Sequence, residues 1–217
     1  NFTGAGFATL TNGAVAFQFS AKTKDVRLRY PAGISSISDS EIQLVHSAQR
    51  SSISGTVTVR RLVFNPQQDT AGMLADISHA APIPSAGDDS LAGMNLDIQI
   101  QTAPDVALQS KVAESIQADA SLRLRGTISD PALLGRVNIS QGSVLFFGNK
   151  YTISRGTISF YNPAKIDPIL DVDLQTRARG VDVTLTVTGP PSHLGFTYRS
   201  DPPLEFSDIV ALLATGR

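Results

Sequence analysis

The feature that most constrains the fold of this chain is an alternation of apolar and polar side chains that recurs along most of its length. In the segment 118–125, alanine and leucine at even positions oppose Asp119, Ser121, Arg123 and Arg125 at odd positions. A period of two residues places successive side chains on opposite faces of a β-strand. The same alternation recurs at 25–30, 56–60, 95–100, 170–175, 181–188 and 194–198. Strands buried on both faces would be continuous apolar runs, so the pattern predicts an antiparallel, all-β fold.

The number of strand-like segments limits the shape of the sheet. About fourteen to sixteen segments can be counted, which at about 4.8 Å per strand give a sheet roughly 70 Å across. A sheet of that size curls, or splits into two packed layers. A split sheet is a filled β-sandwich without a ligand, whereas a curled sheet leaves a long apolar trough. The apolar set is mostly Val, Ile and Leu, with 6% aromatic residues and no Trp, which favours the trough.

One phrase occurs twice: ISQGSVLFF is followed fourteen residues later by ISRGTISFY. The step from Ile139 to Val144 is an odd number of residues, which would put the two side chains on opposite faces of a regular strand. A turn or a bulge between them restores the facing, and glycine adopts the positive φ angles that such features use. We therefore predict Gly142 and Gly156 as structural turns of successive hairpins in one meander.

Two stretches depart from the alternation. Residues 67–92 begin with apolar residues at helical spacing and continue with prolines and Gly87, which predicts a short helix followed by a loop. Residues 205–214 carry Ile209, Val210, Leu212 and Leu213, and this spacing predicts an amphipathic helix. Both helices are short, so we expect them to act as a lid or plug on the sheet.

The sequence does not indicate an enzyme. His46, His79 and His193 lie near no nucleophile and have no metal-ligand spacing, and no phosphate-binding or nucleotide-binding motif is present. Asp171 and Asp173 share one strand face, where two carboxylates could bind a divalent cation or simply be solvated, and we favour the second interpretation. We therefore expect no catalytic residues, no metal and no cofactor.

Nucleic acid is not an expected partner either. The net charge is −1, and the arginine pairs are offset by acidic residues and lack interleaved aromatic residues. Charged polar faces that discourage edge-to-edge aggregation explain these pairs better. The four pairs lie at 27/29, 60/61, 123/125 and 177/179.

The second half of the chain carries a specific succession of motifs. In order they are Gly126 with Asp130-Pro131, Gly135, Gly142, Phe147-Gly148, Gly156, Phe160, Pro168, Gly189, Ser200-Asp201-Pro202-Pro203-Leu204 and the closing run from Asp208 to Arg217. This succession resembles the conserved C-terminal domain of the TamB family, the translocation and assembly module subunits. The first half resembles that domain more loosely. The resemblance therefore covers most or all of residues 1–217, which we expect to form a single domain.

The resemblance implies a fold and a cellular role. TamB proteins form a β-taco, a long antiparallel meander curled into an open trough with an apolar lumen. They span the periplasm of diderm bacteria from an inner-membrane anchor to a TamA-type barrel partner in the outer membrane. They are implicated in moving phospholipids between the membranes and in assembling outer-membrane proteins, including autotransporters. The anchor and the C-terminal end that docks the barrel are expected to lie outside this chain.

The expected binding site is the lining of the trough, whose ligand would be the acyl chains of phospholipids. An alternative is a scaffold that holds outer-membrane strands by β-augmentation without carrying lipid. The expected lining residues are Val137, Ile139, Val144, Phe146, Ile153, Ile158, Phe160, Val172, Leu174, Val183 and Leu185.

Overall fold

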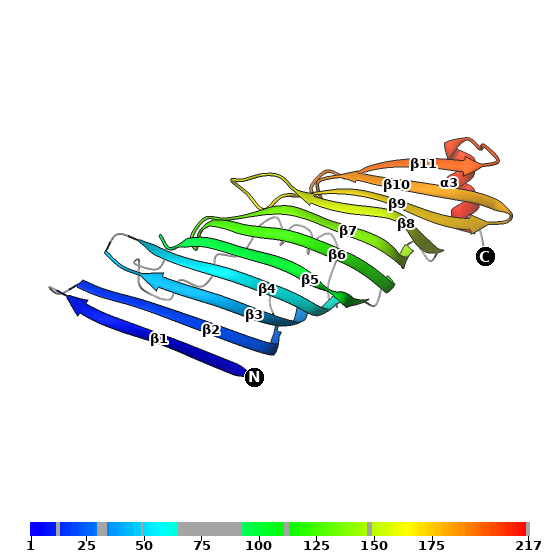
Figure 1. Cartoon of the computed structure of the whole chain (residues 1–217). Helices are drawn as coiled ribbons and strands as arrows, with labels where there is room; N and C mark the ends of the chain where they lie inside the picture. The colour runs from blue at the N-terminus through cyan, green and yellow to red at the C-terminus, as the bar shows by residue number, and fades with distance from the viewer. Residues whose placement is uncertain are drawn as a thin grey trace.

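Eleven long strands and one short helix make up the described part of this computed structural model, which covers residues 1–11, 14–29, 34–48, 50–64, 93–110, 113–146 and 149–215 (Figure 1). The chain order is β1 (Phe2–Thr11), β2 (Ala14–Leu28), β3 (Ile34–His46), β4 (Ser51–Phe64), β5 (Asn95–Ser110), β6 (Ala113–Thr127), β7 (Pro131–Phe146), β8 (Asn149–Phe160), β9 (Pro168–Ala178), β10 (Val181–Gly189), β11 (Gly195–Asp201) and α3 (Phe206–Thr215). The predicted all-β fold is confirmed.

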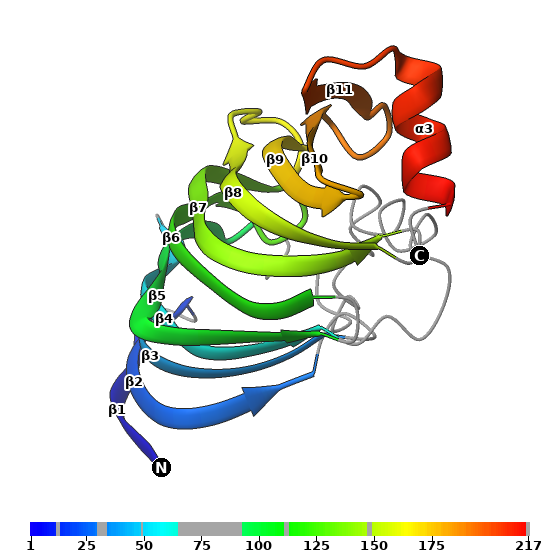
Figure 2. The same ribbon diagram turned by 90° about the vertical axis from the view of Figure 1, so that its right-hand side faces the viewer.

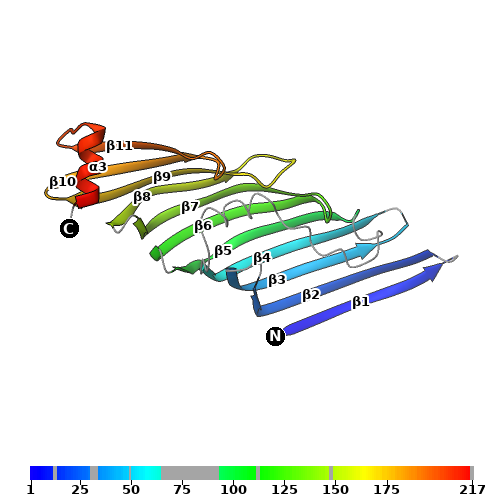
Figure 3. The ribbon, with the colours of Figure 1, turned by 180° about the vertical axis from the view of Figure 1, so that it is seen from behind.

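All eleven strands belong to one sheet, and their order in space is their order in the chain. Figures 1 and 3 show a single layer with β1 at one edge and β11 at the other. The sheet is therefore open, and the predicted trough is confirmed against the two-layered sandwich. Every neighbouring pair is antiparallel except β4 and β5, which run parallel. A parallel pair needs a crossover connection. The connecting stretch contains 67–92, so the helix and loop predicted there lie outside the described residues.

The strands are bent, and the sheet is concave on one side. Figure 2 shows the strands bowed, with α3 on the concave side. The bends coincide with breaks in strand register that recur across the sheet. These breaks fall at 23/26 in β2, 59/61 in β4, 101/108 in β5, 114/117 in β6 and 153/155 in β8. A β-bulge bends its strand and increases the local twist. A line of bulges therefore forms a crease across the sheet and curls it.

The crease corrects the prediction for the repeated phrase. Gly142 lies inside β7 and Gly156 inside β8, so the chain does not reverse at either residue. The odd step in β7 is taken up by a bulge, because Gln141 pairs with Gln117 whereas Ile139 pairs with Ala118. The expected fourteen to sixteen segments are accordingly eleven longer strands, about 48 Å across at roughly 4.8 Å per spacing.

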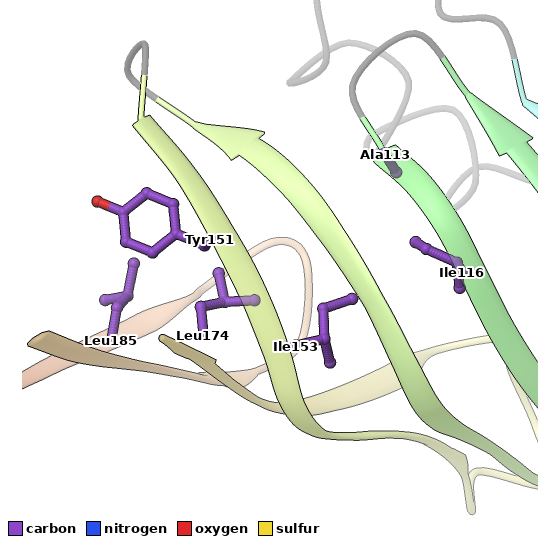
Figure 4. Packing of buried hydrophobic residues seen from close by; sticks show 6 residues of the cluster. All are labelled: Ala113, Ile116, Tyr151, Ile153, Leu174 and Leu185. Carbon is purple, nitrogen blue, oxygen red and sulfur yellow. The ribbon is translucent and has the colours of Figure 1, made fainter. Parts of the chain in front are cut away.

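A cluster of apolar side chains fills the concave side of the C-terminal half. Tyr151, Ile153, Leu174 and Leu185 point toward one another, and Ile116 extends the cluster onto β6 (Figure 4). Leu213 of α3 packs against this cluster, which places the predicted amphipathic helix on the concave face. The core of the protein is therefore one face of a sheet partly covered by one helix.

Candidate functional site

The candidate site is the concave face, which strand register makes continuous. Apolar residues stand opposite one another from strand to strand, as in the pairs of Leu124 with Leu133 and Leu174 with Leu185. The row extends to β1 and β2, where Leu10 pairs with Val15. Among the residues paired in register, none on this face is Asp, Glu, Lys or Arg. A ligand on this face would meet mainly hydrocarbon.

The structure brings the predicted lining residues together on this face. Bulges in β7 and β8 keep the facing constant across the crease, so residues on both sides of it share the concave face. Val144 pairs with Tyr151, and Val137 pairs with Ile158. The side chain of Phe146 lies outside the described part of the structure. The residues placed on the concave face are Val137, Ile139, Val144, Ile153, Ile158, Phe160, Val172, Leu174, Val183 and Leu185. Contact with a lipid stays a prediction for all of them.

Burial differs sharply between the two ends of the concave face. Toward β10, Leu185 is 0% exposed and Val183 is 1% exposed. Toward β1, Leu10 is 72% exposed, Leu28 is 55% exposed and Phe19 is 38% exposed. Sequence reasoning missed this N-terminal apolar surface, although alternation through Val15, Phe17 and Phe19 marks it. Exposed apolar area of this kind is typical of a binding surface.

Hydroxyl groups and one imidazole interrupt the apolar lining on β2 and β3. Thr23 and Ser40 share a hydrogen bond of 2.8 Å between their hydroxyl oxygens. At the end of β3, the ring of His46 stacks on Phe17 with centroids 5.0 Å apart, and Nδ1 lies 2.7 Å from the Ser51 hydroxyl. Each of these polar groups is hydrogen-bonded to its neighbour, so we do not assign a polar binding site to them.

The convex face carries the charges, in pairs that bridge strands. Lys22 pairs with Glu41 at 2.8 Å, and Arg155 lies 3.4 Å from Asp171 and 3.3 Å from Asp173. Arginine is thus the counterion of the two carboxylates considered as a cation site. Within the described residues, no cluster of three or more His, Asp or Glu side chains could hold a metal ion. Of the other histidines, His193 lies in the exposed turn after β10 and His79 lies outside the described residues.

A bidentate charge pair on this face joins Arg123 and Asp97. Nε and Nη2 of Arg123 donate to the two carboxylate oxygens at 2.6 and 2.8 Å. They line an open depression of about 620 Å³ together with Ser54, Gln99 and Ser121. The two ions already satisfy each other, so this depression offers no free charge to a ligand.

This pair gives a prediction that a titration can check. The hydrogen bond from Arg123 holds the pKa of the Asp97 carboxyl below its ordinary 3.8. Because the folded pKa is the lower one, the stabilisation is full above the unfolded pKa of about 3.9 and is lost as the pH falls through the folded value. We expect Arg123→Gln to raise the Asp97 pKa toward 3.8 in a carboxyl ¹³C NMR titration. Lys22→Gln, on a distant strand pair, is the control, and an unshifted Asp97 in Arg123→Gln would contradict the assignment.

The sequence of this sheet matches one known protein family. The family model described as the TamB C-terminal domain matches residues 2–217. No curated protein matched the chain. Among the helices described, none combines the length and apolar character required to cross a membrane. The match thus spans every described strand and the helix.

Proposed function

Because this chain belongs to the TamB family, whose C-terminal domain it matches over residues 2–217, we propose that its concave face carries phospholipid acyl chains between the inner and outer membranes. Proteins of this family are components of a translocation and assembly module in the cell envelope and are not enzymes. They work with TamA-type partners. We propose that the protein works in the periplasm and is anchored to the inner membrane.

One observation carries the proposal: the apolar concave face is continuous in register and exposed toward its N-terminal end. Each methylene of an acyl chain that leaves water for such a face contributes about 0.8 kcal/mol. The face offers no Asp, Glu, Lys or Arg at its paired positions, so it would bind chains without selecting a head group. Such binding suits a path along which many similar lipids move.

A second role is favoured by the capacity of β1 to pair with a further strand. This strand has ten residues without a charge or a proline, and its pairing with β2 is unbroken by a bulge. Charges, prolines and bulges discourage further pairing, and a strand that lacks them readily accepts another strand alongside it. We propose that the module also supports assembly of outer-membrane proteins and autotransporters by holding their strands.

Two phenylalanines on neighbouring strands test the lipid proposal. Phe19 faces the concave side, whereas Phe7 faces the convex side and is 64% exposed. We expect Phe19→Glu to lower the phospholipid that copurifies with the protein several-fold, because a carboxylate without a partner disfavours an apolar environment. Native mass spectrometry of the purified protein gives the amount of bound lipid.

Phe7→Glu is the matched control, since it adds the same charge to the neighbouring strand β1 but on the opposite face of the sheet. Equal lipid in both variants would reject the concave face as the binding surface. Wild-type protein free of lipid that crosslinks to unfolded outer-membrane strands would favour the scaffold instead.

A further inference from the structure

Helix α3 occupies the concave face where the apolar cluster is most buried. Ile209 is 2% exposed, and Leu213 packs on the cluster formed by Tyr151, Leu174 and Leu185. The ring of Phe206 meets Tyr198 of β11 edge to face, with centroids 5.4 Å apart. The helix thus places aliphatic side chains on the surface that the proposed function assigns to acyl chains.

A polar contact joins the far end of α3 to the start of β8. Nδ2 of Asn149 donates to the main-chain oxygen of Leu213 at 2.9 Å. The last carbonyl groups of a helix have no partner within it, so this bond caps the helix while holding it to the sheet.

Its own sequence stabilises α3 only slightly. It has ten residues and no basic side chain in its last turn to oppose the helix dipole. Isolated helices shorter than about 12–15 residues are marginal in water. The segment before it is exposed, and its start is fixed by the Ser200 hydroxyl, which accepts from the Leu204 amide at 2.9 Å. The helix therefore depends on the concave face for its position, and its tether would allow it to leave.

The opposite end of the concave face provides the contrast. There Val26 is 41% exposed and Leu28 is 55% exposed, although both lie on the same face as Leu185. The described structure places no helix over these residues. Along one continuous apolar surface, Leu185 and Tyr151 beside the helix are thus far less exposed than Val26 and Leu28.

We propose that α3 is an internal competitor for the hydrophobic ligand. Seated, it closes the concave face over β8–β10; released, it leaves Tyr151, Leu174 and Leu185 for an acyl chain. This inference rests on the proposed function, because it requires a ligand of the concave face. The inference also means that a ligand reaches the two ends of the concave face differently. The N-terminal end is open, whereas the C-terminal end opens only when the ligand replaces the helix.

A photoreactive fatty acid tests the exchange in the full chain. Palmitic acid carrying a diazirine is photolysed with the protein, and adducts are mapped by peptide mass spectrometry. The measured quantity is the adduct yield in 149–187 divided by that in 14–28, so each molecule carries its own reference. If α3 is seated about nine-tenths of the time, releasing it raises the ratio about tenfold.

Release and locking are made by separate variants. Ile209→Glu puts a charge on the buried side of α3, whereas Val210→Glu puts the same charge on a neighbour that is 43% exposed. Because the chain has no native cysteine, Asn149→Cys with Leu213→Cys can form one disulfide that locks the helix. We expect a raised ratio for Ile209→Glu, an unchanged one for Val210→Glu, and a lowered one for the oxidised lock that dithiothreitol restores.

The results separate the competitor role of α3 from lipid binding by the concave face. A ratio that is the same in wild type, Ile209→Glu and the oxidised lock, with adducts present in 14–28, overturns the competitor role and leaves lipid binding intact. Absence of adducts from both regions in all variants overturns both proposals. Hydrogen exchange of the β10 amides shows whether Ile209→Glu keeps its sheet, and the lock answers independently if it does not.

Discussion

Replacing Leu185 with alanine is expected to lower the free energy of unfolding by about 3–5 kcal/mol, the range for fully buried leucines whose neighbours cannot collapse into the space. Leu185 is 0% exposed and stands between Leu174 and Tyr198 in adjacent strands. Its neighbours belong to hydrogen-bonded strands, so the backbone cannot move in to fill the cavity. Urea denaturation followed by far-UV circular dichroism measures the loss.

The same strand supplies the control. Thr188 of β10 is exposed and lies in the opposite row, facing Gly195 across the strand pair. Thr188→Ala is expected to change the free energy of unfolding by about 0.5 kcal/mol or less, as is usual for surface positions. Equal losses in the two variants would show that the concave face of β10 is not a packed core.

Gly135→Ala is expected to lower the free energy of unfolding by roughly 3 kcal/mol or more, because two penalties combine. The φ angle of Gly135 is +123°, which L-residues rarely adopt. A Cβ atom there would also lie 2.2 Å from the main-chain oxygen of Ser121 in the neighbouring strand. That oxygen belongs to the sheet backbone, so it cannot move away without disturbing the pairing of β6 with β7.

Two other glycines separate these penalties. Gly180 has a φ angle of +85° but open space around the missing Cβ, so Gly180→Ala should cost only about 1–2 kcal/mol from the backbone. Gly93 has open space and no left-handed φ, so Gly93→Ala should be neutral or slightly stabilising. Chemical denaturation of the three variants should rank Gly135 as the largest loss, and a loss at Gly180 equal to that at Gly135 would contradict the steric part.

Alternation alone was enough to predict the class of fold and, within one regular strand, which residues share a face. It depends only on the two-residue period of a strand, which long-range contacts do not alter. Val172 and Leu174 on β9 and Val183 and Leu185 on β10 share a face because each pair is two residues apart. The helix at 205–214 was equally readable, since its apolar residues recur at helical spacing on a segment free of glycine and proline.

The number of strands and the role of the repeated glycines were not readable. An odd step between apolar residues fits a turn as well as a bulge, and the neighbouring strand decides between them. Opposite Gly142, β6 carries its own irregularity at Ser115, whose φ is +52°, and the two strands continue side by side. A single parallel pair within a sheet that has one polar face keeps the same alternation, so the parallel pairing of β4 with β5 had no signal in either strand.

Pairing of each strand with only its neighbours in the chain makes this sheet thermodynamically closer to a repeat array than to a globule. In such arrays, stability is a sum of local terms and nearest-neighbour terms, and distant parts are only weakly coupled. Fraying at β1 would then leave β10 protected, and hydrogen exchange would divide the chain into zones with separate opening free energies. A hairpin could be added or removed with little effect on the rest, so the reach of the sheet is adjustable independently of its stability per strand.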